Sequence, residues 1–182
     1  VLCEVFFDDL KIPSKNLLGG IGGGWGIAMD TLNTQRDPIM LVGYARRLMS
    51  DLIEFIKDPV ADFKSPLGDR ELMTNIGKIE AEIEASRLSC YGLAWKRSNE
   101  TVKIEDWSMV KVLATEMWQK VTDMAIRILG IYGILETQSR LAPLGGRVGE
   151  SYIDSMATTI YLGASEIHRD IIAQRGLGLP AT

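Results

Sequence analysis

The chain has 182 residues, 46% of them hydrophobic, and its 20 Lys and Arg against 24 Asp and Glu give a formal net charge of −4. This length suits one globular domain with at most a short appendage, and an acidic balance without a dense basic run argues against nucleic acid as a partner. Cys3, Cys90 and the single histidine, His168, are too few for a zinc site or a disulfide framework. No stretch approaches the ~20 apolar residues of a membrane span, so we expect a soluble protein of a reducing compartment, the cytoplasm.

Residues 1–7 are predicted to form a short β-strand. They are mostly β-branched or aromatic and run into Asp8, Asp9 and Pro13, as a strand that leads into a turn does. A lone strand leaves its backbone donors and acceptors unpaired, so its partners must come from another chain or from a larger protein. The glycine-rich residues 19–26 follow and are predicted to be a flexible connector.

Three long amphipathic helices are predicted next, over residues 25–57, 69–96 and 105–131. Pro38 should kink the first or mark a join within it, and Gly130 and Gly133 should end the third. Each helix has one apolar stripe at three- and four-residue spacing. The stripes are Leu41, Ala45, Leu48, Leu52 and Phe55; Leu72, Ile76, Ile79, Ile83, Cys90 and Leu93; and Trp107, Val110, Ala114, Met117, Val121, Met124 and Ile128.

A fourth helix is predicted in two pieces, residues 147–159 and 164–175. Between them an aromatic residue, a glycine and small residues interrupt the helical period, which is a common way to shape a floor under a flat ligand. Three long helices and a broken fourth suffice to bury a shared core. The sequence therefore predicts an all-α fold, a four-helix bundle with a short N-terminal β-strand segment.

Few other residues point to chemistry. His168 lies too close along one helix to Ser165 and Asp170 for a catalytic triad, so we expect it on a helix surface or at an interface. The polar residues 35–37 are equally compatible with a structural ion pair and with the lip of a ligand pocket. The residues by themselves support only a helical bundle with one interrupted helix.

Several segments together resemble the C-terminal region of the acyl-CoA dehydrogenase family of flavoproteins. They are residues 5–13, 16–19, 24–29, 82–88, 127–130 and 160–180, which occur in the family's order and with similar spacing. The resemblance implies an all-helical C-terminal domain that follows a helical N-terminal domain and a β domain. On this basis residues 1–22 are the end of the middle β domain with its connector, and residues 23–182 are the C-terminal helical bundle.

The resemblance also implies a reaction. The family binds FAD at a subunit interface and desaturates an acyl-CoA thioester: a carboxylate removes the α proton while hydride leaves the β carbon for the flavin. A positioned base must take the proton, and the cofactor supplies the redox chemistry. We therefore expect FAD, an acyl-CoA substrate, an electron-accepting flavoprotein and a homo- or hetero-oligomer, either a dimer or a tetramer. No metal is expected.

Candidate site residues follow from the same resemblance. The turn that lies against the flavin and the thioester is matched by Tyr161, Gly163, Ala164 and Ser165. The segment that approaches the FAD of a neighbouring subunit is matched by Arg127, Leu129 and Gly130. The helix that borders the acyl-CoA channel is matched by Leu32, Asn33 and Arg36.

The catalytic base departs from the family pattern. Many members have a glutamate just before the glycine of the broken helix, where this chain has Leu162; others have it before the arginine of the first long helix, where this chain has Gln35. Losing a general base typically removes ~10²–10⁴-fold in rate. Asp37 and Glu166 are the weaker candidates for a replacement.

Three hypotheses remain open at this point. The chain belongs to a dehydrogenase whose base comes from elsewhere, to a non-catalytic subunit that pairs with an active relative, or to a helical association module without a cofactor. In each case we expect residues 1–182 alone to bind little or no FAD, because most of the family's flavin pocket lies in the β domain.

Overall fold

The computed structural model describes residues 3–34, 38–58, 63, 65–99 and 101–181. The chain divides into two units, Val1–Gln35 and Arg36–Thr182, and each is described by itself. In the first unit a short 3-10 helix, η1 (Ser14–Asn16), precedes helix α1 (Gly24–Thr34).

The predicted N-terminal strand is wrong for residues 3–7, which form neither a strand nor a bridge. Strand-forming side chains make a strand only where a second strand accepts their backbone hydrogen bonds. No such partner exists among the described residues, and Val5, Phe6 and Phe7 are all exposed. Local propensity alone therefore does not decide the structure of this segment.

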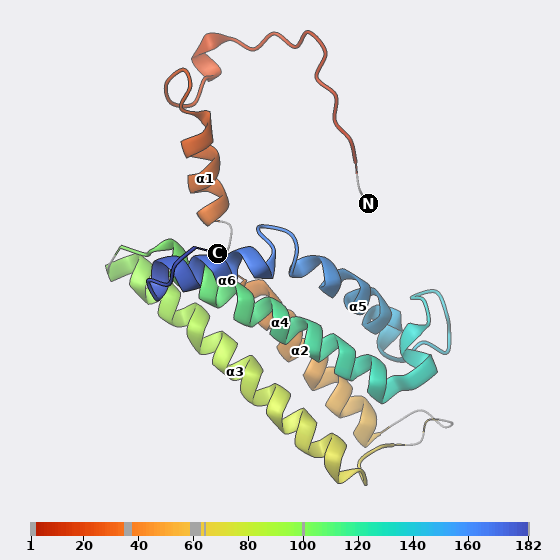
Figure 1. Ribbon diagram of the computed structural model, residues 1–182. Helices are drawn as coiled ribbons and strands as arrows, with labels where there is room; N and C mark the ends of the chain where they lie inside the picture. Colours follow the sequence, from red (N-terminus) through yellow and green to blue (C-terminus); the bar gives the residue numbers. More distant parts are fainter. Residues whose placement is uncertain (1–2, 35–37, 59–62, 64, 100, 182) are drawn as a thin grey trace. The chain divides into compact units, whose positions relative to one another are not determined.

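The second unit is a bundle of five α-helices in the described residues (Figure 1), with bounds α2 (Ile39–Lys57), α3 (Arg70–Asn99), α4 (Ile104–Leu129), α5 (Arg147–Thr158) and α6 (Ser165–Ile171). The 3-10 helices η2 (Gly130–Ile134) and η3 (Pro143–Gly146) connect α4 to α5, and the π-helix η4 (Ile172–Gly176) extends α6. Because α5 and α6 share the place of one long helix, the predicted four-helix bundle with a broken fourth member is confirmed.

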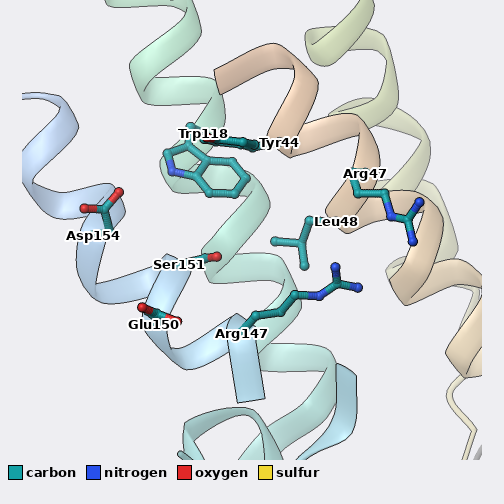
Figure 2. Close-up of a pocket in the computed structure, with 8 residues that line it drawn as sticks. All are labelled: Tyr44, Arg47, Leu48, Trp118, Arg147, Glu150, Ser151 and Asp154. Carbon is teal, nitrogen blue, oxygen red and sulfur yellow. The ribbon is translucent and has the colours of Figure 1, made fainter. Parts of the chain in front are cut away.

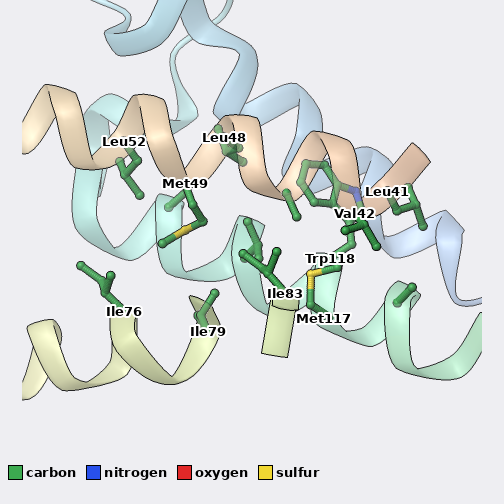
Figure 3. Packing of buried hydrophobic residues seen from close by; sticks show 14 of the residues in the cluster. Leu41, Val42, Leu48, Met49, Leu52, Ile76, Ile79, Ile83, Met117 and Trp118 are labelled. Atoms are coloured by element: carbon green, nitrogen blue, oxygen red, sulfur yellow. The ribbon is translucent and has the colours of Figure 1, made fainter. Parts of the chain in front are cut away.

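Helix α4 is the central element of the bundle. It packs against α2, α3, α5 and α6, and it contributes more buried residues than any other described helix. Figure 3 shows side chains of α2, α3 and α4 pointing toward one another, among them Met49, Ile83 and Met117. Burying each such side chain contributes roughly 1.5–3 kcal/mol, so the apolar stripes supply the main stabilisation of the unit.

The predicted stripes form this core with three exceptions at its edge. Phe55, Leu72 and Met124 are only half-buried, although they pack against the buried cluster. Pro38 stands directly before α2, as its N-cap residue. A proline lacks the backbone N–H that a helix interior needs, so the predicted join at Pro38 is confirmed.

Helix α4 ends at the predicted glycine. Gly130 has a φ of +56°, a left-handed conformation that glycine adopts without the steric cost of a Cβ atom. None of the helices in the described ranges is long and apolar enough to cross a membrane.

Asp106 links the start of α4 to the end of α3. Its Oδ1 accepts a hydrogen bond from Lys96 Nζ at 2.8 Å, and its Oδ2 accepts one from the backbone N–H of Lys103 at 3.0 Å. Burial raises the pKa of Asp106, but the hydrogen bonds from Lys96 and Lys103 outweigh burial and hold this pKa below its usual value. The ionised carboxylate therefore stabilises the connection between the end of α3 and the start of α4.

We predict that Asp106→Asn lowers the free energy of unfolding at pH 7 by about 1–2 kcal/mol, since the variant loses the charge-assisted hydrogen bonds at this helix start. A lowered folded-state pKa contributes stability above the unfolded-state pKa, near 4, and this stability is lost as the pH falls through the folded-state pKa. The difference in the free energy of unfolding between Asp106→Asn and the unchanged chain, measured by urea unfolding, should therefore be smaller at pH 3 than at pH 7.

The exposed carboxylate of Glu71, in the first turn of α3, provides the control, because Glu71→Gln should leave the unfolding curve nearly unchanged. Equal stability of Asp106→Asn and the unchanged chain at pH 7 would contradict this role of Asp106 between α3 and α4.

Candidate functional site

The turn between α5 and α6 is strained. Leu162 has a φ of +56° and Gly163 a φ of +102°. A non-glycine residue in the left-handed region costs roughly 1–2 kcal/mol, and such strain persists only where the surrounding structure holds it. The interruption predicted at residues 160–165 is thus confirmed, and its geometry requires an explanation in the packing around it.

Two buried side chains hold the carbonyl groups of this turn. His168 on α6 is fully buried, and its Nε2 lies 3.1 Å from the carbonyl oxygen of Leu162. Lys111 on α4 is 2% exposed, and its Nζ donates to the carbonyl oxygen of Gly163 at 2.6 Å. The other ring nitrogen of the histidine, Nδ1, lies 3.0 Å from the Ser108 hydroxyl. Side chains from two helices therefore determine the path of the turn.

Helix α4 also holds both flanks of the turn. The Gln119 amide donates to the Thr159 hydroxyl at 3.2 Å, just after the end of α5. Arg169 on α6 forms an ion pair with Glu116 at 2.7 Å. One face of α4 thus positions the end of α5, the turn and the start of α6.

The expectation that His168 lies on a helix surface or at an interface is wrong, because it is buried against α4. Lys111 was not identified as a candidate from the sequence. A sequence pattern that points to both residues exists in α4, where the buried polar residues Ser108, Lys111 and Thr115 recur at three- and four-residue spacing beside the apolar stripe. A polar row with the helical period indicates a buried hydrogen-bond network facing a neighbouring helix.

Several polar groups of the turn have no partner within the described residues. The Ser165 hydroxyl is buried without a hydrogen bond. The amides of Tyr161 and Ser165 donate to the carbonyls of Ala157 and Thr159, but no hydrogen bond in the described residues uses the amides of residues 162–164. Buried polar groups such as the Ser165 hydroxyl are rarely left unpaired in folded proteins, so this hydroxyl and the three amides of the half-buried residues 162–164 are candidates for hydrogen bonds to a ligand or another chain.

The predicted turn residues differ in what they offer. Tyr161 is 44% exposed; burial, and then the negative charge of Asp154, raise the pKa of its hydroxyl above the usual value, so this hydroxyl stays protonated at neutral pH. Leu162, Gly163 and Ala164 are half-buried, and Glu166 is exposed. Leu162, which the resemblance predicts at the position of the base, thus presents a half-buried hydrocarbon side chain.

The second group of predicted residues lies at the far end of α4. Arg127 is exposed and forms an ion pair with Asp123 at 2.7 Å, whereas the Leu129 side chain is 2% exposed and belongs to the core. Gly130 is exposed in its left-handed conformation. Arg127 stands sixteen positions after Lys111, a separation of about 24 Å along a helix, so one chain does not bring the two predicted groups together.

The predicted substrate residues are described only in part. Leu32 is half-buried in α1 of the first unit. Asn33 belongs to the same helix, but its side chain lies outside the described residues, as do Gln35, Arg36 and Asp37. The hypotheses that Arg36 borders a channel and that Asp37 is a base stay predictions.

A cavity of about 500 Å³ opens between α2, α4 and α5. Figure 2 shows the rings of Tyr44 and Trp118 on one side and Arg147 on the other. Arg147 and Arg47 both pair with Asp51. Burial raises the pKa of Asp51, but the hydrogen bonds from Arg47 and Arg147 outweigh burial and lower it. Arg47 and Arg147 therefore share the negative charge of one carboxylate, and the buried Nε of Arg147 has no hydrogen-bond partner among the described residues.

The sequence profile described as "Acyl-CoA dehydrogenase, C-terminal domain" matches residues 22–177. The chain belongs to the acyl-CoA dehydrogenase family. It spans less than half the length of the relatives it matches. The short-chain-specific acyl-CoA dehydrogenase of Megasphaera elsdenii is 29% identical over 166 residues, which cover 90% of this chain and 41% of that protein.

Two solved structures extend the comparison. A variant of the Tcur3481–Tcur3483 steroid ACAD superposes with a TM-score of 0.89 at 25% identity, over 97% of this chain and 46% of that one. The ChsE4–ChsE5 complex from Mycobacterium tuberculosis gives a TM-score of 0.81 at 25% identity, over 97% and 46% of the two chains. The acyl-CoA dehydrogenase helical fold expected for this chain is confirmed.

The packing of the turn predicts the effect of a single methyl group. A Cβ atom on Gly163 would lie 2.7 Å from His168 Nε2, at a φ that L side chains rarely adopt. Gly163→Ala should therefore lower the free energy of unfolding by about 1–3 kcal/mol. Thermal unfolding followed by circular dichroism measures this change.

Gly92 offers a matched control in which the same substitution should change the free energy of unfolding in the opposite direction. It lies within α3, and a Cβ there would meet nothing within 4 Å. Gly92→Ala should raise stability by about 0.5–1 kcal/mol. If the two variants shifted the melting temperature in the same direction, the described geometry of the turn would be contradicted.

Proposed function

We propose that this chain is the C-terminal helical domain of an FAD-dependent acyl-CoA dehydrogenase, in which the turn at residues 160–165 lies against the flavin and the thioester. The observation that carries the proposal is the strained turn itself, whose Ser165 hydroxyl and three amides have no hydrogen-bond partner in the described parts of the chain. Strain and unpaired polar groups in one place are features of ligand sites. Family membership supports FAD and an acyl-CoA thioester as the ligands.

Each group of the turn has a part in this proposal. When bound, FAD accepts the hydride that leaves the β carbon of the acyl chain. The amides of the turn and the Ser165 hydroxyl offer hydrogen bonds to polar atoms of the bound molecules, and Tyr161 offers an aromatic surface and a protonated hydroxyl. The half-buried Leu162 keeps water from the reacting carbons but accepts no proton. The base must therefore come from outside this turn.

The missing carboxylate favours a second candidate function, that of a non-catalytic subunit which completes a shared site with an active relative. The structure named for two proteins, ChsE4 and ChsE5, supports it as an example of a complex within the same fold. In this version Arg127, about 24 Å along the helix from Lys111, and the nearby Gly130 approach the FAD of the other subunit.

The proposal includes an assembly. Trp95, Met109 and Leu113 are exposed and line a groove of about 730 Å³ between α3 and α4, and exposed apolar patches of this kind mark interfaces. We propose that another acyl-CoA dehydrogenase chain covers this face, as a homo- or hetero-oligomer. A cytoplasmic location, an electron-accepting flavoprotein partner and the division of the chain at residues 22 and 23 belong to the same proposal.

The proposal includes a longer parent protein in which the remaining domains of the family are joined to these residues. Absorbance spectroscopy of that purified protein separates the candidates. We expect the visible absorbance bands of an oxidised flavin. Flavin seen only after co-expression with a second family member favours the shared site. Colourless protein in both preparations would contradict the proposal and leave a helical association module.

Restoring a carboxylate tests the assignment of Leu162. We expect Leu162→Glu in the same protein to raise the rate of acyl-CoA desaturation by about 10²-fold or more, the range typical of a general base. Leu162→Gln is the matched control, because it has the same shape without a basic carboxylate. Equal rates of the two variants, with flavin content unchanged, would show that residue 162 does not face the α carbon.

A further inference from the structure

Lys111 and His168 act on consecutive peptide groups of the turn. The carbonyl oxygen of Leu162 accepts a hydrogen bond from His168, and that of Gly163 accepts one from Lys111. A carbonyl oxygen only accepts, so His168 Nε2 carries the proton in this contact. Neither Lys111 nor His168 has a place in the functions proposed above, although both are almost fully buried.

Because a peptide group is planar, these two contacts also determine which way the amides of the next residues point. The C=O and N–H bonds of a trans peptide group point in opposite directions across its plane, and no peptide bond in the described chain is cis. The carbonyl of Leu162 shares a peptide plane with the amide of Gly163, and the carbonyl of Gly163 shares one with the amide of Ala164. Holding both carbonyls against buried donors therefore turns both amides away from His168 and Lys111.

Burying the charged side chain of Lys111 lowers the stability of the fold unless other interactions compensate it. Moving an ammonium group out of water costs several kcal/mol unless hydrogen bonds compensate it, and a neutral side chain of the same length would fill the same space in α4. The hydrogen bond from Lys111 to the carbonyl of Gly163 is one such compensation, and it also helps to hold the strained backbone of the turn.

We propose that Lys111 and His168 are positioning residues: they aim the amides of Gly163 and Ala164 out of the bundle to hydrogen-bond an acceptor oxygen of the molecule that the turn holds. This inference rests on the proposed function for the identity of that molecule, which is the flavin. The positioning itself rests only on the contacts described above.

Flavin binding by the apo form of the parent protein tests the role in ligand binding, measured as quenching of FAD fluorescence during titration. Lys111→Met removes the donor and keeps most of the aliphatic chain; we expect about tenfold weaker FAD binding, equivalent to about 1.4 kcal/mol. Lys120→Met is the matched control, because Lys120 lies on the same helix and forms an exposed ion pair with Glu82. It should bind FAD as the parent protein does.

Position 168 supplies a second pair of variants. Gln presents a side-chain N–H close to the place of Nε2, so His168→Gln should keep FAD affinity within about threefold, whereas His168→Leu should lose about tenfold. If Lys111→Met does not fold, this pair carries the test. Rescue by Gln distinguishes a hydrogen bond to the turn from mere filling of the core.

Nuclear magnetic resonance of the 182-residue chain tests the positioning without flavin. Long-range ¹H–¹⁵N correlations of the imidazole should show a proton on Nε2 of His168, and the amide resonances of Gly163 and Ala164 should move in Lys111→Met but not in Lys120→Met. An imidazole protonated only on Nδ1 would overturn the positioning role.

The two experiments separate the possible failures. A parent protein that binds no FAD, alone or with a second family member, overturns the proposed function together with the ligand assigned here. A parent protein that binds FAD equally well with and without the Lys111 ammonium overturns the positioning role and leaves the proposed function standing.

Discussion

The structure depends on how the α5–α6 turn is fixed to α4. Two consecutive carbonyls, those of Leu162 and Gly163, accept hydrogen bonds from His168 and Lys111, which are buried inside the bundle. Without these donors the carbonyls would be left unpaired at a cost of about 1–3 kcal/mol each, and the left-handed backbone at Leu162 would have little to hold it. The break between α5 and α6 is therefore held in place by specific hydrogen bonds from buried side chains.

Fixing the turn from α4 also explains the arrangement around it. The same helix carries Glu116 and Gln119, which hold the flanks, and its far end carries the segment that starts at Arg127. One straight, central helix thus sets the distance between the turn and its own C-terminal end. Because that distance is about 24 Å, one copy of the chain does not bring the two sets of candidate residues together.

The sequence predicted the bundle well, because apolar residues at three- and four-residue spacing specify a helix and its buried face at once. The break was also predictable, since Gly163 and its small neighbours disrupt that spacing. The strand at residues 3–7 was not, because a strand depends on a partner that local sequence does not reveal.

The polar network was harder to predict than the apolar core. His168 was expected outside because a lone histidine carries no spacing pattern, and Lys111 escaped notice because a charged residue usually marks a solvated face. Only the contacts across α4 and α6 reveal that both are buried and act on the same turn. Family resemblance assigned residues to the turn, while the physical means of holding it became visible only in three dimensions.

The central claim, that this turn lies against a flat redox ring with hydrocarbon where a base normally stands, is tested most directly by a crystal structure of the parent protein with FAD. The account predicts an amide nitrogen of Gly163 or Ala164 within about 3.2 Å of an oxygen of the flavin, and the Leu162 side chain beside them. A flavin bound elsewhere, with the turn in contact only with solvent or protein, would contradict it.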